Sequence, residues 1–270
     1  MSVAYAEVIG DPIAHSKSPV IHQFWLQRLG IEGEYRATRV LPEALGTFIA
    51  DRSGDPAWRG CNVTIPHKIA IMDHVADPGS VRASIGAMNA IARDEGGAIM
   101  GTNTDAAGFY APISDMDLEG APVAVIGSGG AAHAVLFALS RNNVANVALF
   151  VRNPLKGARL LARFGLNGTV HNMAAALPPV DLLVNATSLG MVGQPELNVD
   201  LGPLPKHAVV YDLVYAPLLT PLLAAAEKRG LATVDGLEML IGQAALAFEL
   251  FFGAAPPRNC DDELRALLTA

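Results

Sequence analysis

The sequence predicts an α/β protein built from two α/β domains, and three observations support this. Short apolar runs alternate with stretches of helical periodicity, first before residue 105 and again after residue 120. The second series opens with a glycine-rich turn between a buried run and a helix. The chain has 270 residues, 51% of them hydrophobic, which is enough to fill two moderate cores.

The first series alternates strand-like and helical segments up to the turn at residue 105. Its expected strands are 4–9, 35–40, 60–63, 90–93 and 98–100. Its expected helices are 19–29, 42–52 and 80–85. This alternation predicts an α/β domain.

The second series reads as a parallel α/β unit with right-handed crossovers. Its expected strands are 122–126, 147–151, 182–185, 209–213 and 231–234, and its expected helices are 131–141 and 155–164. The apolar stretch 239–252 contains Gln243 and Glu249. A bilayer requires about 20 apolar residues, so this stretch is expected to be a core helix.

Composition and charge exclude several classes of protein. A formal net charge of −7 with scattered basic residues argues against a nucleic-acid partner. Cys61 and Cys260 are far apart, without C-x-x-C spacing, and Cys61 is expected as a buried strand thiol. The first ten residues lack a basic segment followed by an apolar core, so we expect no signal peptide, no membrane association and a cytoplasmic location.

No metal site is expected, because no group of His, Cys or Asp residues has ligand spacing. The histidines are expected at helix ends or on the surface rather than as ligands. They are His15, His22, His67, His74 and His133.

Two motifs place an amine and a carboxylate at the ends of separate apolar runs. The first is Asn62-Val63-Thr64-Ile65-Pro66-His67-Lys68, and the second is Asn103-Thr104-Asp105. Pro66 stops the strand, so Lys68 should emerge at the mouth of a sheet, where ligand sites of open α/β folds collect. A buried Lys and Asp that meet suit proton transfer. The simpler alternative is a solvated Lys68 and an Asp105 that only caps a helix.

A third motif, His15-Ser16-Lys17-Ser18-Pro19, follows the first strand and opens a helix. Two hydroxyls one residue apart can both bind a carboxylate, and Pro19 suits the first turn of a helix. Unpaired N–H groups at the helix start also favour an anion. The alternative is an ordinary serine cap.

The segment from Gly127 to Ala132 fits G-x-G-x-x-A between a strand and a helix, with Ser128, Gly130 and Ala131 filling the other positions. The first glycine permits the tight turn, the second permits close approach of a pyrophosphate, and the small Ala132 allows close packing. The glycine pattern alone often marks only a turn. The strand before it and the helix after it strongly favour a dinucleotide site.

The next strand ends at Val151-Arg152-Asn153, with Lys156 one turn further on. A site selective for NAD would place an acidic residue there for the ribose hydroxyls, and this sequence has none. Cations suit the 2′-phosphate of NADP better. The alternative is that Arg152 and Lys156 are solvated surface charges.

Together the motifs resemble the shikimate dehydrogenase family, in order along nearly the whole chain. Further matching segments are Ile85-Gly86-Ala87-Met88-Asn89, Asn185-Ala186-Thr187-Ser188-Leu189-Gly190-Met191, Asp212-Leu213-Val214-Tyr215 and Asp235-Gly236-Leu237-Glu238-Met239-Leu240-Ile241-Gly242-Gln243. The resemblance implies two domains meeting across a cleft. Residues 1–105 plus 240–270 would bind substrate, and residues 106–239 would form a Rossmann-like domain that binds NADP.

The resemblance also implies reversible hydride transfer between NADP and 3-dehydroshikimate, giving shikimate, an intermediate of aromatic amino acid biosynthesis. Lys68 and Asp105 are assigned jointly as the acid/base pair. The implied substrate-binding residues are Ser16, Ser18, Thr64, Asn89, Tyr215 and Gln243. The implied cofactor-binding residues are Gly127, Ser128, Gly129, Gly130, Ala131, Arg152, Asn153, Lys156, Thr187 and Met239.

The chain departs from the commonest family pattern at Ala90, Val151 and Asn153, which leaves the catalytic pair intact. Quinate or an aminated shikimate analogue therefore remain alternative substrates, although Ser18 favours shikimate over quinate. A catalytically idle NADP-binding homologue is a further alternative, and retention of Lys68 and Asp105 argues against it. A methylene-tetrahydrofolate dehydrogenase-like enzyme would leave the two serines without a role. Self-association and a biosynthetic or catabolic role stay open.

Overall fold

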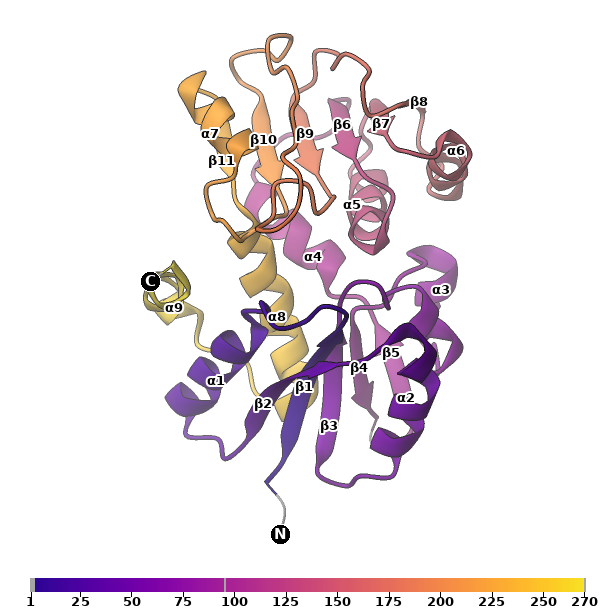
Figure 1. Ribbon diagram of the computed structural model, residues 1–270, viewed down its shortest axis with the longest axis vertical. Coiled ribbons are helices and arrows are strands. Elements are labelled where there is room, and N and C mark those ends of the chain that lie inside the picture. Colours follow the sequence, from indigo (N-terminus) through magenta and orange to yellow (C-terminus); the bar gives the residue numbers. More distant parts are fainter. Residues whose placement is uncertain (1–2, 95, 270) are drawn as a thin grey trace. The chain divides into compact units, whose positions relative to one another are not determined.

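The computed structural model describes residues 3–94 and 96–269 (Figure 1). Residues 1, 2, 95 and 270, which the predicted domain ranges include, lie outside the described residues. The chain divides into two compact units, Met1–Asp105 with Ile241–Ala270, and Ala106–Leu240. It passes between them within two helices, α4 (Asp105–Tyr110) and α8 (Gly236–Phe252).

The first unit contains a mixed five-stranded sheet in the order β2-β1-β3-β4-β5. The strands are β1 (Tyr5–Gly10), β2 (Glu34–Arg39), β3 (Trp58–Val63), β4 (Ala90–Arg93) and β5 (Ile99–Thr102). The first three run parallel, whereas β4 is antiparallel to both of its neighbours. The carboxyl ends of β1, β3 and β5 and the start of β4 therefore lie along one edge of this sheet.

Helices pack on this sheet and bury its side chains. They are α1 (Ser18–Leu29), α2 (Leu45–Ser53), α3 (Val81–Ser84) and the later part of α8, with short 3₁₀ turns at Pro42–Ala44, Ala70–Asp73 and Arg258–Cys260. The last helix, α9 (Asp261–Thr269), packs on α1. Pro19 occupies the first turn of α1, and Gly30 ends that helix in the left-handed conformation with φ 64°. Phe251 of α8 packs with Val8 and Tyr35 in the apolar core over the sheet.

The second unit contains a fully parallel six-stranded sheet in the order β11-β10-β9-β6-β7-β8. The strands are β6 (Pro122–Ile126), β7 (Asn146–Phe150), β8 (Gly168–His171), β9 (Leu182–Asn185), β10 (Val209–Asp212) and β11 (Ala232–Val234). The helices α5 (Gly130–Arg141), α6 (Pro154–Arg163) and α7 (Pro221–Lys228) connect them, with a 3₁₀ turn at Ala111–Ile113. The strand order reverses between β6 and β9, which is the doubly wound arrangement of dinucleotide-binding domains.

The α/β class predicted from the sequence is confirmed, and most expected elements are present within a few residues. The elements that the sequence analysis did not give include β8, α7 and the helices α4 and α9. β8 is four residues long, begins with glycine and is partly exposed, so its sequence lacks the apolar run that marks the central strands. The antiparallel direction of β4 was also not predicted, because apolar patterning does not encode strand direction.

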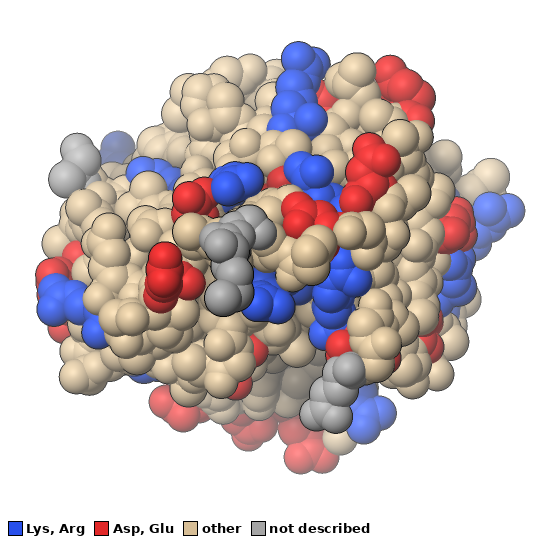
Figure 2. Space-filling view, turned by 90° about the horizontal axis from the view of Figure 1, so that it is seen from below, with Lys and Arg blue, Asp and Glu red and all other residues tan. Residues whose placement is uncertain are grey.

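Exposed charged side chains of both signs are present among the described residues. On the face shown in Figure 2, Lys and Arg side chains of the described residues alternate with Asp and Glu side chains and do not merge into one basic patch. Among the helices of the described residues, none is long and apolar enough to cross a membrane.

Candidate active site

Lys68 and Asp105 meet at the carboxyl edge of the first sheet. β3 ends at Val63 and the following turn delivers Lys68, while β5 ends at Thr102 and the next three residues lead to Asp105. Lys68 Nζ donates to Asp105 Oδ2 at 2.5 Å, and the two side chains are 14% and 4% exposed. The pair is therefore shielded from most solvent, while the ammonium retains some access to it.

Asn89, just before β4, lies at the centre of a buried polar cluster beside this pair. Its Nδ2 lies 2.9 Å from Asp105 Oδ1 and 2.8 Å from Thr104 Oγ1, and its Oδ1 accepts from Thr104 N at 2.6 Å. Nδ2 also lies 3.1 Å from Gln243 Oε1, which α8 supplies from more than 150 residues later in the chain. The structure thus brings together Lys68, Asp105, Asn89 and Gln243, all named from the sequence.

Three further polar residues of this region were not assigned roles from the sequence. Thr104 contacts both Asn89 and, at 3.4 Å, Gln243. The Tyr35 hydroxyl donates to Asn62 Oδ1 at 2.5 Å, and Asn62 Nδ2 donates to the Asn89 carbonyl at 3.3 Å. Thr104 and Asn62 lie within the two quoted motifs, so their position was a usable signal. Tyr35, in another strand, carried none.

The turn that bears Lys68 is fixed from both sides. The Lys68 carbonyl accepts from Met88 N at 2.7 Å, directly before Asn89. His67, next to Lys68, is 1% exposed, and its Nε2 lies 2.7 Å from the Val40 carbonyl. The expectation that His67 lies at a helix end or on the surface is therefore wrong. Its ring ties the turn to the end of β2.

The two serines of the third motif lie between β1 and α1, at the same edge of the sheet. Ser18 begins α1 and is 4% exposed, and its N–H donates to Ser16 Oγ at 3.3 Å. Thr64 follows β3, where its N–H donates to the Ile9 carbonyl at 2.9 Å. A Cβ on Gly10 would lie 2.6 Å from Thr64 Cγ2, so glycine at that position lets the two segments approach.

In the second unit, the glycine-rich turn connects β6 to α5 at the point where the strand order reverses. Gly127 has φ 120°, and a Cβ there would lie 2.9 Å from the Ala186 carbonyl oxygen. A Cβ on Gly129 would meet no atom within 4 Å, so the space beside its backbone is open. No side chain caps the N-terminus of α5. These features fit a bound pyrophosphate.

The expected 2′-phosphate residues follow β7. Arg152, Asn153 and Lys156 are all exposed, whereas Val151 is 1% exposed and belongs to the core. Asn153 caps α6, with its Oδ1 accepting from Lys156 N at 3.2 Å. Its side-chain oxygen is therefore already used within the protein, while the Arg152 guanidinium faces solvent.

The remaining predicted residues occupy different surroundings in the second unit. Thr187 is half-buried in the turn after β9, and its hydroxyl donates to Asn185 Oδ1 at 2.7 Å. Tyr215 is half-buried in the loop after β10. Met239, near the start of α8, is 7% exposed and packs in the apolar core of this unit.

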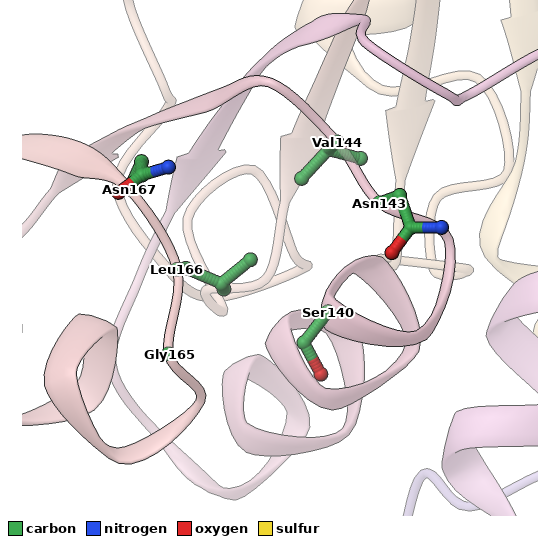
Figure 3. A pocket seen from close by; sticks show the side chains of 6 residues that line it. All are labelled: Ser140, Asn143, Val144, Gly165, Leu166 and Asn167. Atoms are coloured by element: carbon green, nitrogen blue, oxygen red, sulfur yellow. The ribbon is translucent and has the colours of Figure 1, made fainter.

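Two pockets lie away from these residues. One, of about 250 Å³, is lined by Ser140, Asn143, Val144, Gly165, Leu166 and Asn167, between the end of α5 and the segment that leads into β8 (Figure 3). The other, of about 510 Å³, lies in the first unit beside Ala4, Arg59 and Phe252. Each pocket lies at the edge of its sheet that holds the amino ends of the parallel strands. The Lys68–Asp105 pair and the glycine-rich turn lie at the opposite edges, which hold the carboxyl ends. Across the described residues, no three His, Cys, Asp or Glu side chains are grouped to hold a metal ion.

These features define a class, an α/β oxidoreductase with a dinucleotide-binding unit and a Lys–Asp pair on a second unit. The family model "Shikimate dehydrogenase substrate binding domain" matches residues 8–91, and the model "Shikimate 5'-dehydrogenase C-terminal domain" matches residues 236–261. The chain is 67% identical over 266 residues to shikimate dehydrogenase (NADP(+)) of Sphingopyxis alaskensis, covering 98% of this chain and 97% of that protein. The chain belongs to the shikimate dehydrogenase family.

Solved structures agree with this assignment. The crystal structure of shikimate 5-dehydrogenase from Thermus thermophilus in complex with NADP(H) and shikimate superposes with a TM-score of 0.86 at 35% identity, covering 98% of this chain and 99% of that one. Quinate dehydrogenase from Corynebacterium glutamicum in complex with NAD superposes with a TM-score of 0.85 at 26% identity, covering 98% and 99%. The fold is therefore shared with a shikimate dehydrogenase solved with NADP(H) and with a quinate dehydrogenase solved with NAD.

Proposed function

We propose that the protein catalyses the reversible NADP-dependent reduction of 3-dehydroshikimate to shikimate. The observation that carries this proposal is the Lys68–Asp105 pair at 2.5 Å, with Asn89 bonded to the same carboxylate. The 67% identity to a shikimate dehydrogenase (NADP(+)) over nearly the whole chain supports the substrate and the cofactor.

Lys68 and Asp105 together perform the proton transfer in this proposal. Reduction of the ketone develops negative charge on its oxygen, which the Lys68 ammonium stabilises while a proton is delivered to that oxygen. Asp105 holds the ammonium in place, and Asn89 occupies the other oxygen of the carboxylate. Because Lys68 and Asp105 are coupled, the transferred proton is assigned to the pair.

The substrate carboxylate is assigned to Ser16 and Ser18. Both hydroxyls lie at the start of α1, where N–H groups without helical partners favour an anion. Thr64, Asn89 and Gln243 are assigned to the ring hydroxyls and carboxylate, and Tyr215 is assigned to closing the pocket. The buried cluster of Asn89 and Gln243 already orients two of these amides before substrate arrives.

NADPH, when bound, supplies the hydride to the carbonyl carbon. The turn from Gly127 to Ala131, including Ser128, Gly129 and Gly130, would hold its pyrophosphate, because the turn is open at Gly129 and leads into a helix without a side-chain cap. Arg152 and Lys156 would neutralise the 2′-phosphate. Thr187 and Met239 are assigned to the cofactor as well, although Met239 also packs in the core.

A steady-state comparison tests the proposal directly. Shikimate, quinate and aminoshikimate are each oxidised with NADP and with NAD, and kcat/KM is measured for the six pairs. We expect the highest efficiency with shikimate and NADP. Higher efficiency with quinate or aminoshikimate would show that this compound, and not shikimate, is the preferred substrate. Turnover of none of the three would favour a catalytically idle NADP-binding homologue. A cytoplasmic location, and the absence of nucleic-acid and membrane partners, remain predictions from the sequence.

A further inference from the structure

Asp212, the last residue of β10, is a buried carboxylate for which the proposed mechanism has no use. It is 0% exposed, and desolvation by its surroundings raises the pKa of its carboxyl, opposed by its hydrogen bonds to Thr220, Val214 and Asn185. Burial of a carboxylate is unfavourable unless hydrogen bonds compensate for the lost water. Its location at the carboxyl edge of the second sheet suggests a role there.

Three segments of the chain donate hydrogen bonds to this carboxylate. Asn185 Nδ2, at the end of β9, donates to Oδ1 at 2.8 Å, and Val214 N, in the loop after β10, donates to the same oxygen at 3.0 Å. The Thr220 hydroxyl donates to Oδ2 at 2.7 Å while it caps α7. The Asp212 carboxylate therefore holds together the end of β9, the loop after β10 and the start of α7.

The hydrogen bond that Asn185 donates to Asp212 contributes to fixing which way that amide faces, together with a bond from the same Nδ2 to the Leu189 carbonyl at 3.1 Å. An ionised carboxylate only accepts hydrogen bonds, so the NH₂ group of Asn185 must face Asp212 and its Oδ1 must face the opposite side. On that side, Oδ1 accepts from Thr187 N at 3.0 Å and from Thr187 Oγ1 at 2.7 Å. The Thr187 hydroxyl in turn accepts from Leu189 N at 3.1 Å. The carboxylate of Asp212 therefore acts on the whole turn after β9 through the orientation of the Asn185 amide.

This turn lies against the glycine-rich turn. A Cβ on Gly127 would be 3.0 Å from Thr187 Cγ2, so Thr187 borders the crevice at the point where the strand order reverses. Dinucleotides bind in this crevice of doubly wound sheets. A rotated Asn185 amide would present its NH₂ group to the N–H of Thr187, and the turn would have to move away.

We propose that Asp212 is a positioning residue for the dinucleotide, acting through the amide of Asn185 on the turn that carries Thr187. The inference rests on the proposed use of NADP by this chain. It predicts that removing the carboxylate weakens dinucleotide binding even though Asp212 does not touch the ligand. Because one hydrogen bond to a charged group is involved, we expect about a tenfold or greater rise in the Kd for NADPH.

The test measures NADPH binding by fluorescence titration for wild type, Asp212→Ala and Asp212→Asn. The Asn variant can still offer one oxygen to Asn185 and Val214, so its Kd should stay within about threefold of wild type. Asp212→Ala should show the full rise of about tenfold or more in the Kd for NADPH. Equal losses in both variants would overturn the proposal, because they would make the charge rather than the oriented amide responsible.

Two further variants separate positioning from general destabilisation. Leu204→Ala removes a core side chain of the same unit, 4% exposed and outside the crevice, so it should lower the melting temperature with little change in the Kd for NADPH. Asn185→Ala should weaken NADPH binding as Asp212→Ala does, and the double variant should lose no more than either single variant. If Asp212→Ala does not fold, Asn185→Ala with Asp212→Asn carries the test.

The outcomes also separate this inference from the proposed function. Wild-type protein that binds no NADPH would refute the proposed cofactor. Wild-type binding that survives unchanged in folded Asp212→Ala protein, or that is equally weakened by Leu204→Ala, would refute only the positioning role.

Discussion

His22 should make the first unit sensitive to acid. It is fully buried in α1, its ring stacks on Tyr35 with centroids 3.9 Å apart, and neither ring nitrogen has a hydrogen-bond partner within the described residues. Desolvation by burial lowers the pKa of His22 from 6.5 to about 3. The folded protein therefore holds this ring neutral, whereas the unfolded chain protonates it below about pH 6.5.

The sign and size of the effect follow from this difference. The contribution of the neutral His22 ring to the free energy of unfolding is fully present above about pH 6.5. It is lost as the pH falls toward 3, because only the unfolded chain gains the proton. Between pH 7 and pH 5 the loss attributable to His22 is about 2 kcal/mol, since each pKa unit corresponds to about 1.4 kcal/mol. His22→Leu should remove this part of the pH dependence, whatever its absolute stability.

The assay is urea unfolding at pH 7 and pH 5, followed by tryptophan fluorescence. The chain has two tryptophans, Trp25 and Trp58, and both are buried in the first unit, so the signal reports the unfolding of that unit. His207→Gln is the control, because that ring lies on the second unit with a side chain 71% exposed. If His22→Leu and wild type lose equal stability between the two pH values, the burial argument for His22 is refuted.

Three further outcomes are expected. Lys68→Met should lower kcat by roughly 10²-fold or more without unfolding the protein, and turnover at the wild-type rate would remove Lys68 from the mechanism. Arg152→Ala should reduce kcat/KM for NADP while barely changing it for NAD, and equal losses with both cofactors would contradict a 2′-phosphate contact. Lys17→Met should raise KM for shikimate by a few-fold, because Lys17 Nζ donates to the Leu268 carbonyl at 2.6 Å and so fixes the segment between the two serines. Arg28→Met removes the ion pair with Glu263 at the other end of α1 and the contact of Arg28 with the Phe24 ring, and it should leave that KM unchanged. An equal rise in both variants would show that the docking of α9, rather than Lys17 itself, sets the KM.

The sequence predicted the elements better than it predicted their surroundings. The central strands were found because Val123, Val125 and their neighbours form continuous apolar runs, which a strand buried on both faces requires. His22 was expected at a helix end or on the surface, and burial proves that wrong. Its environment is set by Tyr35 and Phe248, which arrive from other elements, so local sequence could not reveal it.

The candidate site shows the same limit. Lys68 and Asp105 could be named because each follows shortly after an apolar run, whereas Asn89 was implied only by the family resemblance. Their contact with Gln243 depends on α8 returning to the first unit, which local pattern does not contain and which only the family resemblance implied. The buried hydrogen bond between Tyr35 of β2 and Asn62 of β3 spans the strand β1 that lies between them, and Tyr35 carried no sequence signal for it. The roles of these residues toward substrate and cofactor stay predictions.

The division of the first unit into two stretches has a consequence for protein synthesis. The second unit is continuous, so its sequence is complete before residues 241–270 are translated. The first sheet lacks Ala247 and Phe251 of its apolar core until those last residues emerge, although its strands are made first. The unit that starts the chain is therefore the last to be completed, and its exposed sheet must be protected from aggregation in the meantime. Limited proteolysis of a released chain truncated after residue 240 would show the second unit protected and the first still open.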